Sequence, residues 1–363
     1  MEGLLSAGPL RPDGGGGWWR PFAWVAVAAS SFGLAAWLLS LGDEPAPPAA
    51  PAVAFPDRLR PPEAQRAVAR RRLPAPAAPA ATARPRDPLL AALPPGGSAI
   101  VLEANALRNS PVGELLLSCF TANDPRLFDQ FRQEVGVDLL QGLDRIALSD
   151  RAVEATGQFG GARWSALAKG DPGQGYGDDG VLYRIAGDGG SPMTMARWGD
   201  QLLAFTPSPE SARQVIDRVE GRGDDGPPVL SEGQTYGDAY GVLTGAWLSG
   251  LVKTMLSGPG QAPLEDRLLS AANSVELHLD AQSDLELTAT FTGPDAAAVD
   301  DLGRAVGGAL SLWRLGAAAK GNAKLSALLE QAKVVPKEGS FTLDLAMPLS
   351  LVRELLGSCG KKP

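Results

Sequence analysis

The sequence predicts an α+β protein in which duplicated strand-helix-helix-strand-strand-helix units follow one transmembrane helix and a disordered Pro/Ala-rich linker. Residues 22–41 contain no charged side chain, as a membrane span requires. Between Pro45 and Pro95 lie 14 of the 31 prolines, among many alanines. From residue 94 onward, short apolar runs alternate with turn signals in an order that recurs in two halves.

The apolar segment FAWVAVAASSFGLAAWLLSL spans about 30 Å as a helix, the thickness of the hydrocarbon layer. Two arginines precede it and two carboxylates follow it, so the positive-inside rule places the N-terminus in the cytoplasm. Aromatic side chains toward both ends suit the headgroup level. The residues expected to anchor the span are Trp18, Trp19, Phe22, Trp24, Trp37 and Leu41.

A cleaved signal peptide is the alternative to an uncleaved anchor. The apolar run is longer than a usual signal core, and no small-x-small cleavage site precedes Gly42. Cleavage after Ala54, at the end of APAVA, stays open. Both alternatives place the rest of the chain outside the cytoplasm. For a Gram-negative envelope, this predicts a single-pass inner-membrane protein with a periplasmic C-terminal domain.

The linker cannot bury enough apolar surface to offset its conformational entropy, so we expect it to be disordered. The chain is accordingly divided into a cytoplasmic tail at 1–20, a transmembrane signal anchor at 21–42, a linker at 43–93, and two halves of an extracytoplasmic domain at 94–227 and 228–359.

Charge is unevenly distributed along the chain. Residues 45–92 carry eight arginines and three carboxylates, a net charge of +5, whereas the chain from residue 93 onward carries −11. An acidic domain repels nucleic-acid phosphates, so a nucleic-acid partner is not expected. The basic linker suits either contact with anionic lipid or glycan, or plain solvation.

In the first half, SAIVLEAN predicts a strand, and Ser110-Pro111 supplies the cap and first turn of a helix through Cys119. A second helix is expected from Asp124-Pro125 to Gly136. DRIALSD, RWSALAKG and VLYRIAG are predicted to be strands, and ARW and LLAF a hairpin. Ser208-Pro209 begins a helix through Val219.

In the second half, YGVLTGAW predicts a strand and GLVKTML and LEDRLLSAA predict helices. SVELHLD and LELTATFTG alternate as two paired strands. Pro294 begins helices that are expected to end near Lys333. FTLDLAM, predicted as a strand, leads into a helix over 350–356.

A repeat supports duplication. ALRNSPVGELLLSC, from Ala106, matches AMPLSLVRELLGSC, from Ala346, at eight of fourteen positions, and AWLSGLVKTML, from Ala246, is a fainter third copy. The combination of LPPGGSAIVLEANALRNSPVGELL, FRQEVGVDLLQGLDRIALSD and LLAFTPSPESARQVIDRV resembles uncharacterised bacterial membrane-anchored or secreted proteins of the domain-of-unknown-function type. That resemblance implies an extracytoplasmic duplicated α+β fold and carries over no catalytic residue.

The two cysteines, Cys119 and Cys359, each end a matching helix and are predicted to meet an oxidising compartment. Duplication puts them at matching positions of the two copies, so a disulfide between them is one hypothesis. Two separate buried thiols are the other.

The only histidine, His278, limits the catalytic arrangements that the chain can form. In SVELHLD it alternates with apolar residues and shares a polar face with Glu276 and Asp280, which predicts an exposed strand face. No cysteine or histidine spacing indicates zinc. The acidic glycine loops GYGDDG, AGDGG and GRGDDG lack EF-hand spacing, so solvated turns are expected in place of calcium sites. We expect no metal and no cofactor.

The expected function is that of a membrane-anchored periplasmic binding or scaffold protein without catalytic activity. Its partner beyond the membrane is an unidentified envelope protein, glycan or lipid. A carrier of apolar ligands, with a cleft between the halves, is one alternative. A carboxylate-based envelope hydrolase is another, for which Glu103 and Asp344 on strand segments are the available acids.

Overall fold

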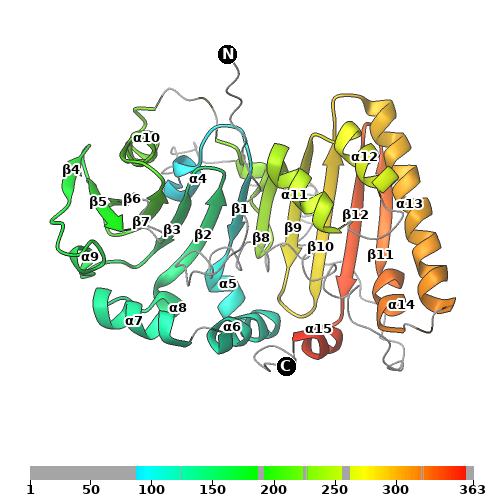
Figure 1. The fold of residues 1–363 in the computed structure, drawn as a ribbon, viewed down its shortest axis with the longest axis horizontal. Coiled ribbons are helices and arrows are strands. Elements are labelled where there is room, and N and C mark those ends of the chain that lie inside the picture. The colour runs from blue at the N-terminus through cyan, green and yellow to red at the C-terminus, as the bar shows by residue number, and fades with distance from the viewer. Residues whose placement is uncertain are drawn as a thin grey trace, which may run out of the picture.

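The computed structural model describes residues 87–123, 125–186, 192–223, 226, 228–255, 262–319, 321 and 323–356. These residues form a mixed α/β fold around one twelve-stranded antiparallel sheet (Figure 1). The strand order is β11-β12-β10-β9-β8-β1-β2-β3-β7-β6-β5-β4. This architecture confirms the predicted mixture of helices and strands.

The strands are β1 (Ala99–Leu102), β2 (Leu143–Ser149), β3 (Val153–Gly157), β4 (Gln174–Tyr176), β5 (Gly180–Ala186), β6 (Pro192–Trp198), β7 (Leu202–Thr206), β8 (Ala239–Thr244), β9 (Ser274–Asp280), β10 (Leu285–Thr292), β11 (Ala332–Lys337) and β12 (Ser340–Met347). The α-helices are α4 (Pro88–Ala92), α5 (Ala104–Arg108), α6 (Pro111–Asn123), α7 (Pro125–Val135), α8 (Leu139–Gly142), α9 (Trp164–Leu167), α10 (Pro209–Val219), α11 (Gly245–Met255), α12 (Ala262–Ala271), α13 (Ala296–Ala319), α14 (Ala323–Glu330) and α15 (Leu349–Leu356).

The two halves of the sheet share one strand order. The series β1-β2-β3-β7-β6 corresponds to β8-β9-β10-β12-β11, and β5 and β4 extend only the first half. The halves join where β1 pairs antiparallel with β8, with Ile100 opposite Gly241 and Val101 opposite Tyr240. In this correspondence α6 follows β1 and matches α11 after β8, whereas α15 follows β12. The strong match from Ala106 to Ala346 therefore joins positions that are not equivalent in the sheet, and the fainter copy from Ala246 is the equivalent one.

Most predicted elements are confirmed, including the caps. The Ser110 hydroxyl accepts a hydrogen bond from the Gly113 backbone N–H at 2.9 Å, and the Ser208 hydroxyl accepts one from that of Ser211 at 3.2 Å. Each cap satisfies a backbone donor that the first turn of the helix leaves free. The predicted hairpin of β6 and β7 is also present, with Trp198 paired to Leu202.

Three predicted elements are wrong in type or extent. RWSALAKG contains α9 where we expected a strand, because Trp164 and Leu167 reach the same buried cluster through helical spacing. β8 ends at Thr244, since Gly245, at φ +49°, leaves the extended conformation and starts α11. The helices that follow Pro294, α13 and α14, end at Glu330 and not near Lys333. The strand β11 comes directly after them, and the sequence pattern did not predict it.

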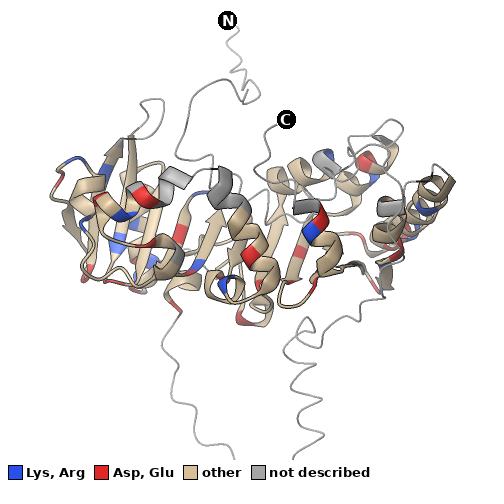
Figure 2. Ribbon diagram, turned by 90° about the horizontal axis from the view of Figure 1, so that it is seen from below, with Lys and Arg blue, Asp and Glu red and all other residues tan. Residues whose placement is uncertain are grey.

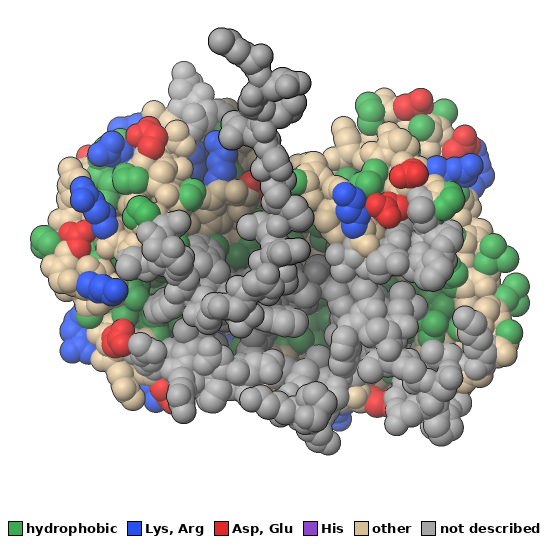
Figure 3. Space-filling view, in the orientation of Figure 1, with side chains coloured by type: hydrophobic (Ala, Val, Ile, Leu, Met, Phe, Trp, Pro, Cys, Tyr) green, Lys and Arg blue, Asp and Glu red, His purple; other side chains and the backbone are tan. Residues whose placement is uncertain are grey.

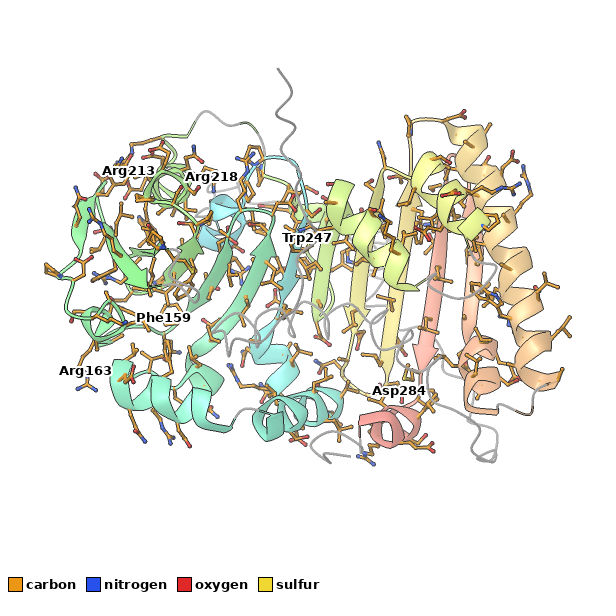
Figure 4. All side chains as sticks on the ribbon, in the orientation of Figure 1. Phe159, Arg163, Arg213, Arg218, Trp247 and Asp284 are labelled. Carbon is orange, nitrogen blue, oxygen red and sulfur yellow. The ribbon has the colours of Figure 1, made fainter. Side chains whose placement is uncertain are left out.

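The end of the predicted linker is folded. Asp87 caps α4 by accepting a hydrogen bond from the Leu89 N–H at 3.0 Å, and Leu89, Leu90 and Leu93 belong to a buried cluster with α10. Arg218 of α10 fixes the other end of α4 by donating to the Ala92 carbonyl at 2.7 Å (Figure 4). The boundary at residue 93 is therefore corrected, because the fold includes Asp87 and α4.

The helices cover the two halves of the sheet differently. In the first half, α4 and α10 pack on one face, and α7 and α9 close a second core around Phe159 on the other (Figure 4). In the second half, α11, α12, α13 and α14 all lie on one face, over the largest core (Figure 1). Among the described α-helices, none packs on the opposite face of the second half.

The surface of α13 carries two exposed large hydrophobic side chains. Leu312 and Leu315 are 68% and 69% exposed, and Figure 3 shows hydrophobic side chains along the margin where α13 lies. Acidic and basic positions are interspersed along both halves of the ribbon (Figure 2).

No helix of the described residues is long and apolar enough to cross a membrane. The predicted anchor at 21–42, its aromatic residues and most of the predicted linker lie outside those residues, as does Cys359. The helix α6, which contains Cys119, contacts α15, which ends three residues before Cys359, but nothing is described of the Cys119 side chain. The disulfide stays a prediction.

Candidate functional site: the polar face of the sheet

The candidate site follows from strand alternation in the second half. On β9, Val275, Leu277 and Leu279 point into the core beneath the helices, so the residues between them point the other way. Antiparallel pairing places side chains of β10 and β12 beside them on the same side. We call this surface the polar face; its central residues are Glu276, His278, Asp280, Glu286, Thr288, Thr290, Thr342 and Asp344.

His278 lies at the centre of the polar face, but it is not exposed as we predicted. Its side chain is only 1% exposed, and the predicted open strand face is wrong at this position. The Tyr236 ring stacks on the imidazole with ring centroids 3.6 Å apart and an interplanar angle of 8°. The Nδ1 atom lies 3.1 Å from the Tyr236 carbonyl oxygen, and Nε2 lies 2.7 Å from Glu276 Oε1.

The segment that buries His278 is residues 230–238, which we call the strap. A capping box formed by Ser231 and Gln234 holds its 3₁₀ turn, Glu232–Gln234. The Gln234 side-chain amide donates to Glu276 Oε2 at 3.0 Å, beside the Tyr236 stack. Gly237, at φ +94°, lets the chain turn into β8 where a Cβ would come within 2.7 Å of the Leu279 carbonyl oxygen.

The strap ends at Asp238, which fixes the turn between β9 and β10. Its carboxylate accepts hydrogen bonds from the Ala281 N–H at 2.8 Å and from the Gln282 side-chain amide at 3.1 Å. Asp238 is 1% exposed, so these bonds replace water around a buried charge. The strap is therefore anchored to β9 at its tip and to the β9–β10 turn at its end.

Burial and pairing act in opposite directions on the carboxylates of this region. The hydrogen bond from His278 is the largest influence on Glu276, whose pKa is lowered, with further support from Gln234. Burial raises the pKa of Glu103 even though the Tyr240 hydroxyl donates to it at 2.9 Å. Burial likewise raises the pKa of Asp344, against the effects of Thr288 and two lysines of β11.

The two acids considered for hydrolysis do not face each other. Glu103 follows β1, Asp344 lies on β12, and β8, β9 and β10 separate the two strands. At about 4.8 Å per strand this separation is about 19 Å, beyond the roughly 6.5–9.5 Å of an inverting glycosidase pair. Each therefore belongs to its own hydrogen-bonding group, and the structure does not bring them together as a catalytic pair.

A half-buried charge pair links the start of the fold to the sheet. Arg145 on β2 donates to both carboxylate oxygens of Asp87, at 2.5 and 2.7 Å. Burial would raise the pKa of Asp87, but this bidentate pair and the backbone donors of α4 lower it overall. The pair fixes α4 over the first half, next to Glu103 and Tyr240.

Sequence reasoning missed Glu154. It lies on β3 in the first half, 0% exposed, with both carboxyl oxygens 3.4 Å from the Ser149 hydroxyl. Burial raises its pKa to about 8, against the opposing effects of Arg218 and Ser149. The sequence AVEATG gave no signal of this burial, because a charged residue in a short strand usually faces solvent.

One of the three acidic glycine loops, GYGDDG, lies wholly within the described residues. In the described parts of the chain, no group of three or more histidines, cysteines and carboxylates is placed to hold a metal ion. The GYGDDG loop forms the β4–β5 turn, where Asp178 and Asp179 donate their backbone N–H groups to Glu220. The AGDGG and GRGDDG loops lie partly outside the described residues.

Comparison with known proteins finds no matching family model, no matching curated protein and no matching solved structure.

Proposed function

We propose that this protein is a membrane-anchored, extracytoplasmic binding or scaffold protein and that the polar face is its binding surface. The supporting observation is the uneven covering of the second half: α11 to α14 lie on one face, and among the described α-helices none lies on the other, which carries only the strap. A sheet normally buries both faces or leaves one in water. The centre of the polar face is buried, with His278 1% and Glu286 4% exposed, so a partner would contact its exposed edge on β11 first.

The chemistry of the polar face favours a partner that forms hydrogen bonds. Its rows combine threonine hydroxyls with carboxylates, and Lys333 and Lys337 are exposed at its outer edge on β11. An apolar-ligand carrier is less well supported, because it would need an apolar cleft lined by few polar groups. A polar segment of an envelope protein, or a glycan, fits this surface best.

His278 does not favour the hydrolase alternative. A general base needs one ring nitrogen free to take a proton from a nucleophile or a water. In this structure both ring nitrogens face protein acceptors, and the ring lies under Tyr236. A binding role therefore explains this region with fewer changes of structure than a catalytic one.

The tether gives the domain reach. By random-coil scaling, about 50 linker residues give a mean end-to-end distance of about 40 Å, so the folded part can contact partners away from its membrane. We infer that the two halves, which share one strand order, arose by duplication and that the polar face belongs to the second copy. The first copy has α4 and α10 at the corresponding place.

The membrane topology is tested with reporter fusions. Alkaline phosphatase fused after Gly42 is expected to be active and a cytoplasmic reporter at the same position inactive, because the positive-inside rule places this point outside. The opposite pair of results would contradict both the topology and the periplasmic location of the domain.

The binding surface is tested by photo-crosslinking in living cells. A photoreactive residue in place of Lys333, on the polar face, is expected to give a defined adduct. The same residue in place of Ser311, exposed on α13 on the other side of the sheet, is the matched control. Equal adducts at the two positions, or none at Lys333, would count against the polar face.

A charge-reversal pair sharpens this test. Lys337→Glu lies at the same exposed edge of the polar face, four residues along β11 from the crosslinker, and is expected to reduce the adduct several-fold, because it replaces a hydrogen-bond donor with an acceptor. Arg304→Glu, exposed on α13, is expected to leave the yield unchanged.

A further inference from the structure

The strap is held on the polar face through two neighbouring side chains of β9. Glu276 accepts a hydrogen bond from the side-chain amide of Gln234. The His278 ring stacks on the Tyr236 ring, and its Nδ1 atom lies within hydrogen-bond distance of the Tyr236 carbonyl oxygen. Glu276 and His278 are also bonded to each other, at 2.7 Å. Any change in the protonation of this pair therefore acts directly on the attachment of the strap.

The hydrogen-bond geometry fixes how many protons the pair carries. The Tyr236 carbonyl oxygen can only accept, so Nδ1 must donate to it. An ionised Glu276 can only accept, so Nε2 must donate as well. A neutral imidazole has a single N–H and cannot satisfy both partners. The closed strap therefore requires one proton between His278 Nε2 and Glu276 in addition to the one on Nδ1, and the lowered pKa of Glu276 places that proton on the imidazole.

The surrounding groups are consistent with that arrangement. On β9 itself, Asp280 lies two residues beyond the imidazole on the same face, and on β10 Glu286 pairs with Asp280. On β8, Tyr240 pairs with His278. Burial raises the pKa of Tyr236 and of Tyr240, so both phenols stay neutral. Lys337 of β11 acts on Glu276 and helps to hold it ionised.

We propose that the strap is a proton-dependent latch over the polar face: the proton shared by His278 and Glu276 holds it closed, and loss of that proton releases it. This inference rests on the proposed function only where it treats the polar face as a binding surface. The closed latch itself is a property of the strap and β9. Release would uncover the centre of the polar face, including His278, Glu276 and Tyr240.

Release follows from the repulsion between a ring nitrogen that has lost its proton and the oxygen acceptor that faces it. When the imidazole loses one proton, either Nε2 faces Glu276 at 2.7 Å or Nδ1 faces the Tyr236 carbonyl oxygen at 3.1 Å, in each case with no hydrogen between the two atoms. An unsatisfied buried polar contact of this kind is unfavourable. Opening the strap lets water satisfy the groups, so opening becomes coupled to one proton.

Glu276 sets the acid limit of the latch. Its pKa is lowered in the folded protein, so its contribution to the closed state is present above its unfolded value and is lost as the pH falls through its folded value. On the other side, the two acceptors around the imidazole require both of its ring protons, so a strap over a singly protonated ring is unfavourable. The latch is therefore closed over an intermediate pH range and opens on either side.

The protonation state can be measured without ambiguity because His278 is the only histidine. In the full-length protein labelled with ¹⁵N-histidine, both ring nitrogens are expected to carry hydrogens at each pH at which the strap is closed. A singly protonated imidazole under a closed strap would overturn the proposal.

Strap opening is measured separately by hydrogen exchange of the peptide that covers residues 230–238. After correction for the intrinsic effect of pH, its protection is expected to fall about tenfold for each pH unit beyond the loss of the proton, as one coupled proton requires. The helix α10, Pro209–Val219, is expected to show no such change. A strap whose protection does not depend on pH would overturn the latch.

Glu276→Gln separates a proton latch from simple packing. The side-chain amide that this substitution introduces can donate to a neutral Nε2 while its oxygen accepts from Gln234, so Nδ1 can still donate to Tyr236. This variant is expected to keep the strap protected at alkaline pH, where the natural protein loses protection by about tenfold or more. A variant that opens in parallel with the natural protein would contradict the proposal.

The latch and the proposed function can fail independently. If strap protection follows pH as expected but the crosslinked adduct at Lys333 is absent at every pH, the latch stands and the binding role of the polar face falls. If the adduct forms with a strap that never opens, the binding surface stands and the latch falls.

Discussion

Glu154→Gln is expected to become progressively more stable than the natural protein as the pH rises from about 4.5 to about 8. Burial raises the pKa of Glu154 to about 8, so the folded protein keeps this carboxyl neutral at pH values where the unfolded chain has released the proton. A raised pKa contributes stability that is present below about pH 4.5 and is lost as the pH rises through about 8. Glutamine keeps the shape but has no proton to lose.

The size of this effect follows from the shift in the pKa. A shift of that size corresponds to a difference of the order of 5 kcal/mol in the free energy of unfolding, developed across the pH range above. The side chain is fully buried, so solvent does not screen the effect. Denaturant titrations of both proteins at a series of pH values would measure it.

Glu338→Gln is the control for this series, since Glu338 is exposed in the turn between β11 and β12. Its free energy of unfolding is expected to follow that of the natural protein within about 0.5 kcal/mol at every pH. A Glu154→Gln protein that follows the natural one equally closely would show that the carboxyl is not held neutral in the fold.

Gly241→Ala is expected to destabilise the protein by about 3 kcal/mol or more. Gly241 lies on β8 opposite Ile100, at the seam where the halves of the sheet join. A Cβ there would lie 2.9 Å from Ile100 Cα and closer still to the Ala99 carbonyl oxygen, both of which are backbone atoms. A methyl group can fit only if the two strands move apart.

Gly308→Ala gives the matched comparison. Gly308 lies on the exposed side of α13, where a Cβ would meet nothing within 4 Å. Alanine in a helix interior is favoured over glycine by about 1 kcal/mol, so this variant is expected to gain stability. Thermal unfolding of the two variants should move in opposite directions, and a stable Gly241→Ala protein would contradict the close approach at the seam.

Local patterns in the sequence were sufficient for elements whose signals lie within a few residues. Ser110 and Ser208 cap helices because a hydroxyl before a first-turn proline satisfies the backbone of that same turn. SVELHLD and LELTATFTG form paired strands because alternation fixes which side chains share a face. RWSALAKG was wrongly predicted to be a strand, because so short a segment has too few residues to distinguish helical from strand spacing.

The candidate site was predicted only in part. Alternation in SVELHLD correctly grouped Glu276, His278 and Asp280 on one face. The same reasoning assigned that face to solvent, because it contains no information about a segment that follows β7 and α10 and returns across the sheet. Tyr236 and Gln234, which bury His278 and bind Glu276, come from that segment.

Local sequence patterns were enough to predict the class of the folded part, the positions of most helices and strands, and the alternation that made one face polar. These depend on neighbouring residues, whose interactions are short in range and readable from spacing. The single twelve-stranded sheet, the burial of Glu154 and His278, and the strap over β9 depend on tertiary packing and could not be predicted from local patterns. Burial depends on which distant segments pack together, and the free energy of that packing belongs to the whole chain.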